Sequence, residues 1–383
     1  MPMTADRTLP FEQAAVLGAG LMGRLMAVAL AQRGCSVDVY EAGSAEAEGA
    51  AARVAAAMLA PLAESAVAPA PVVRMGHYAL DRWPQLLGEL ATPVFFQREG
   101  TLVVWHRQDA TEAARLGRVL AHTAEQVPEL PAMQRLDAAA IAAVEPALGH
   151  RFAAGLLLPG EGQLDNRGLL SALLATLQSM PKVRLHWQSP RTLDDFEPGR
   201  PGQPQRVIDC RGLGVRRQWE QVRGVRGEVI RVHAPDVSLA RPTRLVHPRY
   251  PLYIAPKPDG LFVIGATEIE SEDRSPPSVR STLELLSAAY AVHSGFGEAR
   301  ILEIATQCRP TLPDNLPSLR MPRPGVLQIN GLYRHGFMIA PAILDVALEL
   351  LCSQRSALAA RFGLAPTLDS ASGSVPATLG PTS

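Results

Sequence analysis

A glycine pattern near the beginning of the chain constrains its fold more than any other feature. The apolar strand pattern AAVLGAG (14–20) ends in glycines, a helical pattern fills 21–34, and an alternating strand pattern, SVDVYE, follows at 36–41. The helical pattern is closed by Gly34, a residue type that commonly ends helices. This order of strand, helix and strand predicts a β-α-β unit built on a parallel sheet.

The spacing Gly18-x-Gly20-x-x-Gly23 between that strand and helix is the fingerprint of dinucleotide binding. Gly18 permits a tight turn, Gly20 lets a pyrophosphate approach the backbone, and Gly23 lets helix and strand pack closely. The helix N-terminus offers free N–H groups and a positive dipole end to the phosphates. Glu41 closes the next strand and can accept ribose hydroxyls. We therefore predict a nucleotide site rather than a glycine-rich turn without a ligand.

The fingerprint alone does not decide between NAD and FAD. It lies at the beginning of the chain, and no second GxGxxG follows that could bind a nicotinamide. Both observations favour FAD.

Composition excludes several classes of protein. The chain has 383 residues, enough for two domains, with Lys+Arg and Asp+Glu balanced at 37 each, so no overall charge attracts nucleic acid or an anionic membrane. The four cysteines form no CxxC pair and the histidines form no HxxxH, which predicts no metal site and a reducing cytoplasm. The apolar stretch 14–31 contains Arg24 and glycines, so it predicts neither a signal peptide nor a membrane span.

Patterns along the rest of the chain predict mixed structure. Residues 50–60 read as an Ala-rich helix stopped by Pro61, and 76–154 alternate between helices and short strands. A strand-rich block covers 225–232, 250–268 and 299–307, and its middle part is a hairpin pattern that turns at Pro258-Asp259-Gly260.

A glycine-bracketed polar loop, GLYRHGFMIAP (331–341), follows the strand pattern 326–330. Proline is favoured as a first helical residue, so we expect the next helix to begin at Pro341. After Leu364 the composition turns to Ser, Pro, Ala, Thr and Gly, which predicts a disordered tail over 365–383.

Six stretches occur in a fixed order that resembles the D-amino-acid oxidase superfamily of flavoenzymes, and most of all the glycine oxidases of thiamine biosynthesis. They are AAMLAPLAE (56–64), EGQLDNRGLLSAL (161–173), VRGVRGEVIRV (222–232), HPRYPLYIAPKPDGLFVIGATE (247–268), CRPTLPDNLPSL (308–319) and GLYRHGFMIAP. The resemblance covers about residues 13–352, and the last three stretches are its most specific part.

The fold implied by the resemblance is α/β, with a Rossmann-like FAD-binding domain interleaved with an α+β substrate domain that carries a large antiparallel sheet. The FAD-binding domain would comprise 13–75, 155–215 and 310–364. The substrate domain would comprise 76–154 and 216–309.

The resemblance also implies which residues contact non-covalently bound FAD. Those expected at the adenosine, the pyrophosphate and the flavin ring are Gly18, Gly20, Leu21, Met22, Gly23, Glu41, Ala42, Ala51, Ala52, Ala56, Ala57, Met58, Arg191, Leu332, Tyr333, Arg334, His335, Gly336, Phe337 and Met338. The sequence departs from the family at Arg53 and Ala57, where a hydroxyl residue and a glycine are usual, and whether Arg53 contacts the phosphates is left open.

Substrate binding is implied for Tyr253, Arg309 and Arg334, which would hold a carboxylate or close its pocket. A guanidinium suits this role because its planar fork binds a carboxylate through two hydrogen bonds. Glu268 would point into the same pocket, where an acid can hold an ammonium group. No side chain is expected to act as acid or base, and His335 is not assigned as one, because flavin N5 carries the chemistry.

Cys308 has a covalent counterpart in the sarcosine-oxidase branch of the superfamily, where a cysteine is joined to the flavin. Adjacent residues of a strand face opposite sides, so Cys308 faces away if Arg309 faces the substrate. The expectation is non-covalent FAD.

The activity implied is FAD-dependent oxidative deamination of glycine or another small amino acid to an imine or 2-oxo acid, ammonia and hydrogen peroxide. Dioxygen would accept the electrons, and the product would feed thiamine thiazole synthesis. A D-amino-acid or sarcosine oxidase or dehydrogenase, an NAD(P)-dependent dehydrogenase and a non-catalytic FAD-binding module remain alternatives. A homo-oligomer is compatible with the sequence.

Overall fold

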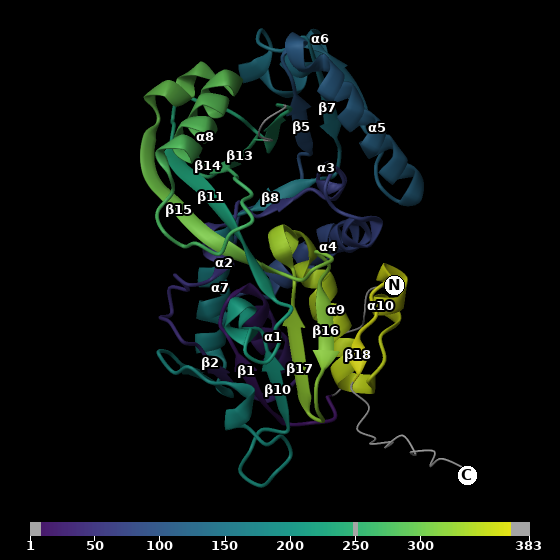
Figure 1. Ribbon diagram of the computed structural model, residues 1–383, viewed down its shortest axis with the longest axis vertical. Coiled ribbons are helices and arrows are strands. Elements are labelled where there is room, and N and C mark those ends of the chain that lie inside the picture. Colours follow the sequence, from purple (N-terminus) through teal and green to yellow (C-terminus); the bar gives the residue numbers. More distant parts are fainter. Residues whose placement is uncertain (1–8, 248–251, 369–383) are drawn as a thin grey trace, which may run out of the picture.

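The computed structural model describes residues 9–247 and 252–368, and the chain folds into two halves (Figure 1). One half is built on a seven-stranded sheet, the other on an eight-stranded sheet, and a three-stranded sheet completes the structure. This arrangement confirms the predicted fold class. The strands of the three-stranded sheet are β3 (Met58–Leu59), β4 (Phe96–Gln97) and β8 (Gly162–Leu164).

The seven-stranded sheet has the order β18-β16-β17-β10-β1-β2-β9, and its strands come from distant parts of the chain. Its strands are β1 (Gln13–Leu17), β2 (Ser36–Tyr40), β9 (Val183–His186), β10 (Arg206–Asp209), β16 (Ser318–Met321), β17 (Val326–Asn330) and β18 (Thr367–Leu368). The five strands from β17 to β9 pair in parallel, and β16 runs antiparallel to β17.

Helices pack together to form the core of this half. They are α1 (Leu21–Gln32), α4 (Ala70–Gly88), α7 (Asn166–Ser179), α9 (Gly336–Ser353) and α10 (Ala357–Phe362). The segment Tyr333–Ser353 is long and apolar enough to cross a membrane, but 83% of its apolar window is buried inside the protein, as expected of a core helix.

The eight-stranded sheet has the order β15-β11-β14-β13-β12-β5-β7-β6, and every pair except β12 with β5 is antiparallel. Its strands are β5 (Thr101–Val104), β6 (Gln134–Asp137), β7 (Ala154–Leu158), β11 (Arg223–His233), β12 (Thr243–Leu245), β13 (Leu252–Lys257), β14 (Leu261–Gly265) and β15 (Arg300–Thr311). The helices of this half are α5 (Ala110–Gln126), α6 (Ala138–Val144) and α8 (Val279–Val292).

The predicted hairpin turn between β13 and β14 is confirmed. Asp259 and Gly260 both have positive φ angles, 61° and 66°, as a tight hairpin turn requires. Residues 248–251 of the stretch that contains this hairpin lie outside the described residues.

The predicted Ala-rich helix over 50–60 is wrong. Only α2 (Ala51–Val54) is helical, β3 follows, and α3 (Pro61–Glu64) begins at the proline. The chain turns at Ala57, which has φ +53°, and its carbonyl accepts from the Leu164 N–H at 3.1 Å. Because tertiary hydrogen bonds decide this backbone path, they override the helical propensity of alanine.

The predicted helix start at Pro341 is also wrong, since α9 begins at Gly336 and contains Pro341. A proline inside a helix leaves the carbonyl four residues earlier without its N–H donor. That carbonyl belongs to Phe337, and it accepts from the indole Nε1–H of Trp83 in α4 at 3.0 Å. The helix therefore passes through the proline without an unsatisfied buried carbonyl.

Two expected domain boundaries fall inside single elements. Residue 76 lies within α4, whose apolar residues share one buried cluster with α9, so we place all of α4 with the parallel-sheet half. Residue 310 lies within β15. The predicted tail is wrong for Thr367–Leu368, which pairs with β16 as β18, and residues 369–383 lie outside the described residues.

Candidate active site

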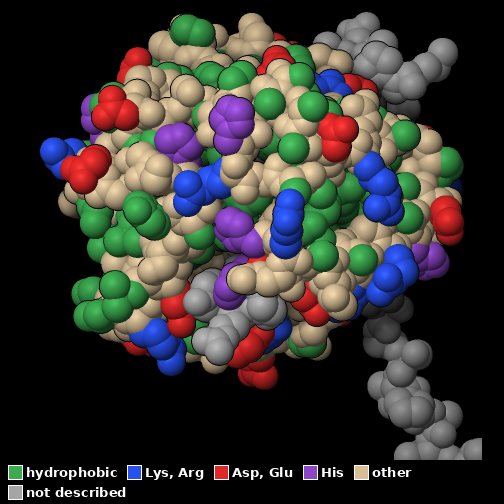
Figure 2. All heavy atoms as spheres, turned by 90° about the horizontal axis from the view of Figure 1, so that it is seen from above, with side chains coloured by type: hydrophobic (Ala, Val, Ile, Leu, Met, Phe, Trp, Pro, Cys, Tyr) green, Lys and Arg blue, Asp and Glu red, His purple; other side chains and the backbone are tan. Residues whose placement is uncertain are grey.

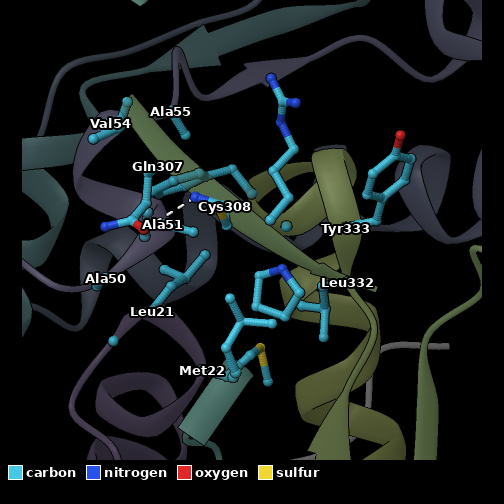
Figure 3. Close-up of a pocket in the computed structure, with 18 of the residues that line it drawn as sticks. Leu21, Met22, Ala50, Ala51, Val54, Ala55, Gln307, Cys308, Leu332 and Tyr333 are labelled. Carbon is cyan, nitrogen blue, oxygen red and sulfur yellow. Dashed lines mark hydrogen bonds between the residues drawn. The ribbon is translucent and has the colours of Figure 1, made fainter. Parts of the chain in front are cut away.

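A cavity with a volume of about 630 Å³ lies where the two halves meet (Figure 3). Four of its lining segments directly follow parallel strands, with Gly18 after β1, Glu41 after β2, Cys210 after β10 and Gly331 after β17. The carboxyl ends of parallel strands are the usual place for ligands in open α/β sheets.

Each of the three fingerprint glycines is required, or favoured, for a different structural reason. Gly18 has φ +86°, and a Cβ on it would lie 2.9 Å from the Arg211 Cα. A Cβ on Gly23 would lie 1.7 Å from the Gly18 carbonyl oxygen, so the helix could not approach the strand. The Cβ position of Gly20 meets only Ala50, at 3.6 Å. The open space beside Gly20 suits a phosphate group.

The N-terminus of α1 faces this space, and no side chain of the helix itself occupies its free N–H groups. Gly20 is the N-cap, no side chain caps the helix, and its first turn carries no acid. The Glu41 carboxylate accepts from the Ala19 N–H at 2.6 Å and from the Gly43 N–H at 2.9 Å. A carboxylate has about four acceptor sites, so Glu41 can also accept hydroxyl groups.

Arg24 supports the glycine loop, a role that the sequence did not reveal. Its buried guanidinium donates to the carbonyls of Ala19 at 2.7 Å, Leu170 at 2.7 Å and Ala45 at 2.6 Å. One side chain thereby ties the fingerprint loop to α7 and to the segment after β2.

Most of the predicted cofactor residues line the cavity. They are Gly18, Gly20, Leu21, Met22, Glu41, Ala42, Ala51, Ala52, Ala56, Ala57, Met58 and all residues from Leu332 to Met338. In Figure 3, Ala50, Ala51 and Ala55 lie on the opposite side of the cavity from Leu332 and Tyr333. Gly23 packs behind this surface, and Ala57 holds φ +53°, where a glycine would be unstrained.

Two arginines considered for the cofactor lie elsewhere. Arg191 lines a separate cavity with Tyr40, and its guanidinium stands over the Tyr40 ring at 5.7 Å. A contact between the adenine and the backbone at Arg191 stays a prediction. Arg53 is not part of the cavity lining, and its Nη1 donates to the Glu46 carbonyl at 2.9 Å. Both sit in segments where alignment by resemblance gives little positional information.

Arg309 and Tyr253 stand together at the far end of the cavity from the fingerprint. The Arg309 guanidinium donates to the carbonyls of Thr267 at 3.1 Å and Arg226 at 3.3 Å. A Cβ on Gly227 would lie 2.2 Å from the guanidinium, so Gly227 makes the room that Arg309 needs. Among the described residues no carboxylate forms an ion pair with Arg309, which leaves a half-buried cation open to an anionic ligand.

Tyr253 of β13 also lies against a glycine on a neighbouring strand, Gly265 of β14. Its hydroxyl lies 2.7 Å from the position that a Cβ on Gly265 would occupy. Burial raises the pKa of Tyr253, so the hydroxyl keeps its proton and can donate to a carboxylate.

A buried acid, Glu64, lies in the same region and was not predicted. It pairs with Arg334 Nε at 3.0 Å and with Arg244, and His335 Nδ1 lies 3.4 Å away. Burial alone would raise the pKa of Glu64, but the charges of Arg334 and Arg244 hold it well below its usual range. The signal in the sequence was a charged residue that ends the apolar stretch 54–63.

His335 is unsuited to accept a proton near neutral pH. It is buried, and burial, with a contribution from Arg334, lowers its pKa to about 4. A base with so low a pKa is a poor proton acceptor at neutral pH. This agrees with the expectation that His335 is not a general base.

Glu268 lies beside the cavity and is engaged within the protein. Its carboxylate accepts from the Tyr333 hydroxyl at 2.7 Å and forms an ion pair with Arg334. Burial first, and Glu268 second, raise the pKa of Tyr333, so that hydroxyl is protonated and donates. The Glu268 carboxylate is thus already bound within the protein, and its contact with a substrate ammonium group stays a prediction.

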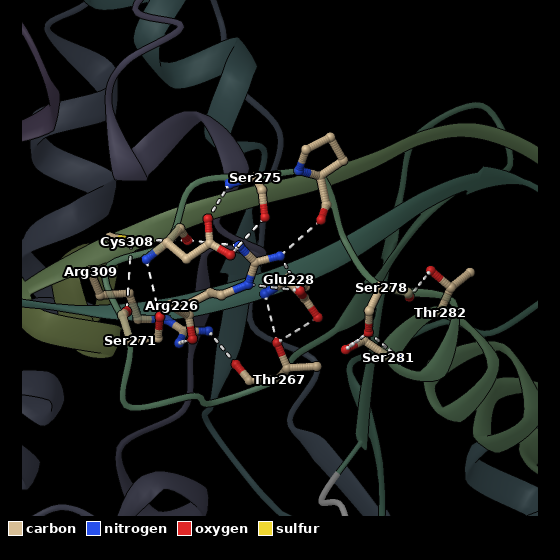
Figure 4. A network of polar contacts seen from close by, with 12 residues as sticks. Arg226, Glu228, Thr267, Ser271, Ser275, Ser278, Ser281, Thr282, Cys308 and Arg309 are labelled. Atoms are coloured by element: carbon tan, nitrogen blue, oxygen red, sulfur yellow. Dashed lines mark hydrogen bonds and ion pairs between the residues drawn. The ribbon is translucent and has the colours of Figure 1, made fainter.

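Polar contacts fix the segment 266–278, which carries Glu268 (Figure 4). Arg226 of β11 pairs with Glu228 at 2.6 Å and donates to the Asp273 carbonyl at 2.7 Å. The Thr267 hydroxyl donates to Glu228 at 3.2 Å. Arg226 also donates to the Pro276 carbonyl at 3.1 Å, so the segment is held against β11 near its beginning and near its end.

Cys308 lies against the same segment. It is buried, and its Sγ lies 3.8 Å from the Asp273 carbonyl and 4.0 Å from the Ser271 carbonyl, although the residue also contributes to the cavity lining. Non-covalent attachment of FAD stays a prediction.

The residues present fit FAD along the whole cavity. An acid and a glycine loop at a helix N-terminus suit the adenosine and pyrophosphate. The small apolar side chains of residues 51–52 and 54–57, with the loop 331–338, leave room for a flat ring. The volume is in the range of cofactor sites.

Comparison with known proteins agrees with this reading. The chain belongs to the FAD dependent oxidoreductase family, whose sequence profile matches residues 13–348, and it is therefore an FAD-dependent enzyme. A Rhizobium etli protein named as a thiamine biosynthesis oxidoreductase, ThiO, is 41% identical over 342 residues, which cover 88% of this chain and 96% of that protein.

Solved structures share the fold. Glycine oxidase from Geobacillus kaustophilus has a TM-score of 0.77 at 23% identity and covers 92% of this chain and 99% of its own. Iminodiacetate oxidase from Chelativorans sp. BNC1 has a TM-score of 0.76 at 22% identity, with coverages of 93% and 99%.

Proposed function

We propose that this protein oxidises a small amino acid such as glycine to the imine, which water hydrolyses to the 2-oxo acid and ammonia, while dioxygen is reduced to hydrogen peroxide. The observation that carries the proposal is the Arg309 guanidinium, which faces the cavity beside Tyr253 without a carboxylate partner among the described residues. Two-electron oxidation and reoxidation by dioxygen are chemistry supplied by non-covalently bound FAD.

The residues of the chain bind and orient the substrate. Arg309 and Tyr253 bind the carboxylate, and a paired charge-assisted contact fixes the direction of Cα. No acid or base is required if the amine enters in its neutral form. The N-terminus of α9, which follows the cavity loop, stabilises negative charge nearby.

The biological setting follows from the relatives. The ThiO protein of Rhizobium etli supports a role in thiamine thiazole synthesis, and we place the enzyme in the cytoplasm, without stable membrane insertion. On the face shown in Figure 2, basic and acidic side chains of the described residues are interspersed, which supports a small-molecule substrate rather than a nucleic acid.

A peroxide-coupled screen of glycine, sarcosine and small D-amino acids tests the proposal. Peroxide formation that needs one of these amines and releases ammonia or methylamine is the expected result. A yellow protein that none of them reduces without oxygen would overturn the function. Reduction without peroxide formation would instead indicate a dehydrogenase with another electron acceptor.

A further inference from the structure

Charged groups at the substrate end of the cavity are unequal in number. Arg309, Arg334 and Glu64 line the cavity there. Arg244 and Glu268 lie beside it and are joined to this group by ion pairs with Glu64 and Arg334. If all five are ionised, this cluster carries one net positive charge, not counting Arg274, which lines the cavity outside the cluster.

The remaining charge can be assigned from the contacts. Arg334 is held on two sides, by Glu64 through Nε at 3.0 Å and by Glu268 through Nη1. Glu64 is shared with Arg244. Neither acid pairs with Arg309, whose guanidinium donates to two backbone carbonyls. The site is therefore complementary to one carboxylate, at Arg309.

We propose that Glu268 determines specificity by neutralising Arg334, so that the enzyme accepts monocarboxylate amino acids and rejects dicarboxylates. This inference rests on the proposed function. A second carboxylate that approached Arg334 would meet a guanidinium already bound by two acids, and those two negative charges would repel it. Removing the Glu268 charge would free part of Arg334 for a second anion.

The position of Glu268 is fixed well enough for this role. The Tyr333 hydroxyl donates to one of its oxygens at 2.7 Å, and the preceding residue, Thr267, accepts from Arg309 through its carbonyl at 3.1 Å. The segment that carries the neutralising acid is thus attached directly to the arginine that stays open. Residues 267 and 268 therefore bind two different arginines: the Thr267 carbonyl accepts from Arg309, and the Glu268 carboxylate pairs with Arg334.

Titration of the FAD-loaded enzyme tests the proposal without turnover. Glycolate serves as the monocarboxylate probe and malonate as the dicarboxylate probe, and the change in flavin absorbance gives each Kd. In the parent, malonate should bind at least ~10-fold more weakly than glycolate. In Glu268→Gln the ratio of the two Kd values should shift toward malonate by roughly ten- to a hundredfold, the range for a charge-assisted pair.

Glu270→Gln is the matched control. It lies on the same segment and removes the same charge, but its carboxylate pairs with Arg223 instead of Arg334. The Kd ratio should stay at the parent value. A second control is Glu268→Gln combined with Arg334→Gln, which should abolish the gain in malonate binding.

Several outcomes would overturn the inference. Equal shifts for both probes in Glu268→Gln would show a general field effect, and an unchanged ratio would show that Arg334 does not receive the second carboxylate. If Glu268→Gln fails to hold FAD, Tyr333→Phe removes the hydroxyl that holds Glu268, and an unchanged ratio there counts against the proposal. If neither probe binds the parent, the proposed function fails instead.

Iminodiacetate provides the corresponding substrate test, because it carries two carboxylates around one amine. The parent should oxidise it poorly relative to glycine, and Glu268→Gln should narrow that difference. A parent that prefers iminodiacetate to glycine would refute the specificity while leaving amine oxidation intact.

Discussion

At the nucleotide end of the cavity the wall consists of backbone and small side chains, whereas at the substrate end it consists of long charged side chains from distant segments. Gly18, Gly20 and Gly23 lie within six residues of one another. Glu64, Arg244 and Arg334 come from α3, β12 and the loop before α9. The first region works through space and backbone N–H groups, and the second through the balance of charges.

The two regions should therefore respond to different kinds of substitution. At the nucleotide end, where backbone segments are in close contact, adding a single carbon atom should disrupt the packing and the binding of the cofactor. A region made of charges tolerates changes of volume but responds to the loss of one partner, because the other is then buried uncompensated.

Gly23→Ala tests the nucleotide end and should have the largest effect. The added Cβ would lie 1.7 Å from the Gly18 carbonyl oxygen, so α1 must move away from β1. We expect a destabilisation of about 3 kcal/mol or more and loss of bound FAD, measured as flavin absorbance per chain. Gly88→Ala, where no atom lies within 4 Å of the added Cβ, is the control and should keep its FAD.

Glu64→Gln tests the charged end. The variant leaves Arg334 and Arg244 without their shared partner, which should cost about 3 kcal/mol at pH 7 in chemical denaturation. The pKa of Glu64 is lowered in the folded protein, so its contribution is present above the unfolded pKa of ~4.3 and is lost as pH falls below it. As the pH falls from 5 toward 2, the free energy of unfolding of the parent should therefore decrease more than that of the variant.

Glu112→Gln is a matched control for that experiment. Glu112 pairs with Arg115 on the surface of α5, and such pairs contribute roughly 0–1 kcal/mol. Equal losses in both variants would contradict the assignment of Glu64 to a buried charge cluster.

Arg309→Lys sharpens the distinction within the charged end. Lysine keeps the charge but loses the planar fork, so KM for the amino acid should rise roughly ten- to a hundredfold, while FAD stays bound. Steady-state kinetics with the best amine from the screen measure it. Arg300→Lys on the same strand, where the arginine donates to the Glu298 carbonyl at 3.0 Å, should leave KM unchanged.

Ala57→Gly should have the smallest effect and the opposite sign. Ala57 has φ +53°, a conformation that costs alanine about 1 kcal/mol and glycine little. After the greater flexibility of the unfolded glycine chain is subtracted, roughly 0.5 kcal/mol of stabilisation should remain in thermal denaturation. Ala55→Gly, at φ −63°, should destabilise, and a gain in both variants would rule out strain at Ala57.

The nucleotide end of the cavity could be predicted from local sequence patterns better than the charged substrate end. The β-α-β unit with its glycine spacing and the Pro258-Asp259-Gly260 turn could be predicted because each has a recognisable pattern within a short stretch of sequence. Arg309 and Tyr253 were reached only through the resemblance, and the structure brings both into the cavity.

Features that depend on distant partners were missed. The charge cluster of Glu64 needs Arg244 and Arg334, which no local pattern connects to it. Helix content over 50–60 was wrong because Lys257 and the Leu164 N–H bind the carbonyls of Ala56 and Ala57. The start of α9 was wrong because Trp83 supplies the hydrogen bond that Pro341 cannot.

That hydrogen bond has a consequence for synthesis on the ribosome. The first turn of α9 is complete only when Phe337 meets Trp83, and the loop that closes the cavity directly precedes this turn. A nascent chain that has emerged as far as the glycine fingerprint lacks the cavity wall formed by residues 331–338. It still lacks that wall when all strands of the eight-stranded sheet have emerged, because the last of them ends at Thr311. Capture of the complete cofactor must therefore wait until the loop 331–338 has emerged, and until then the apolar face that α4 buries against α9 stays uncovered.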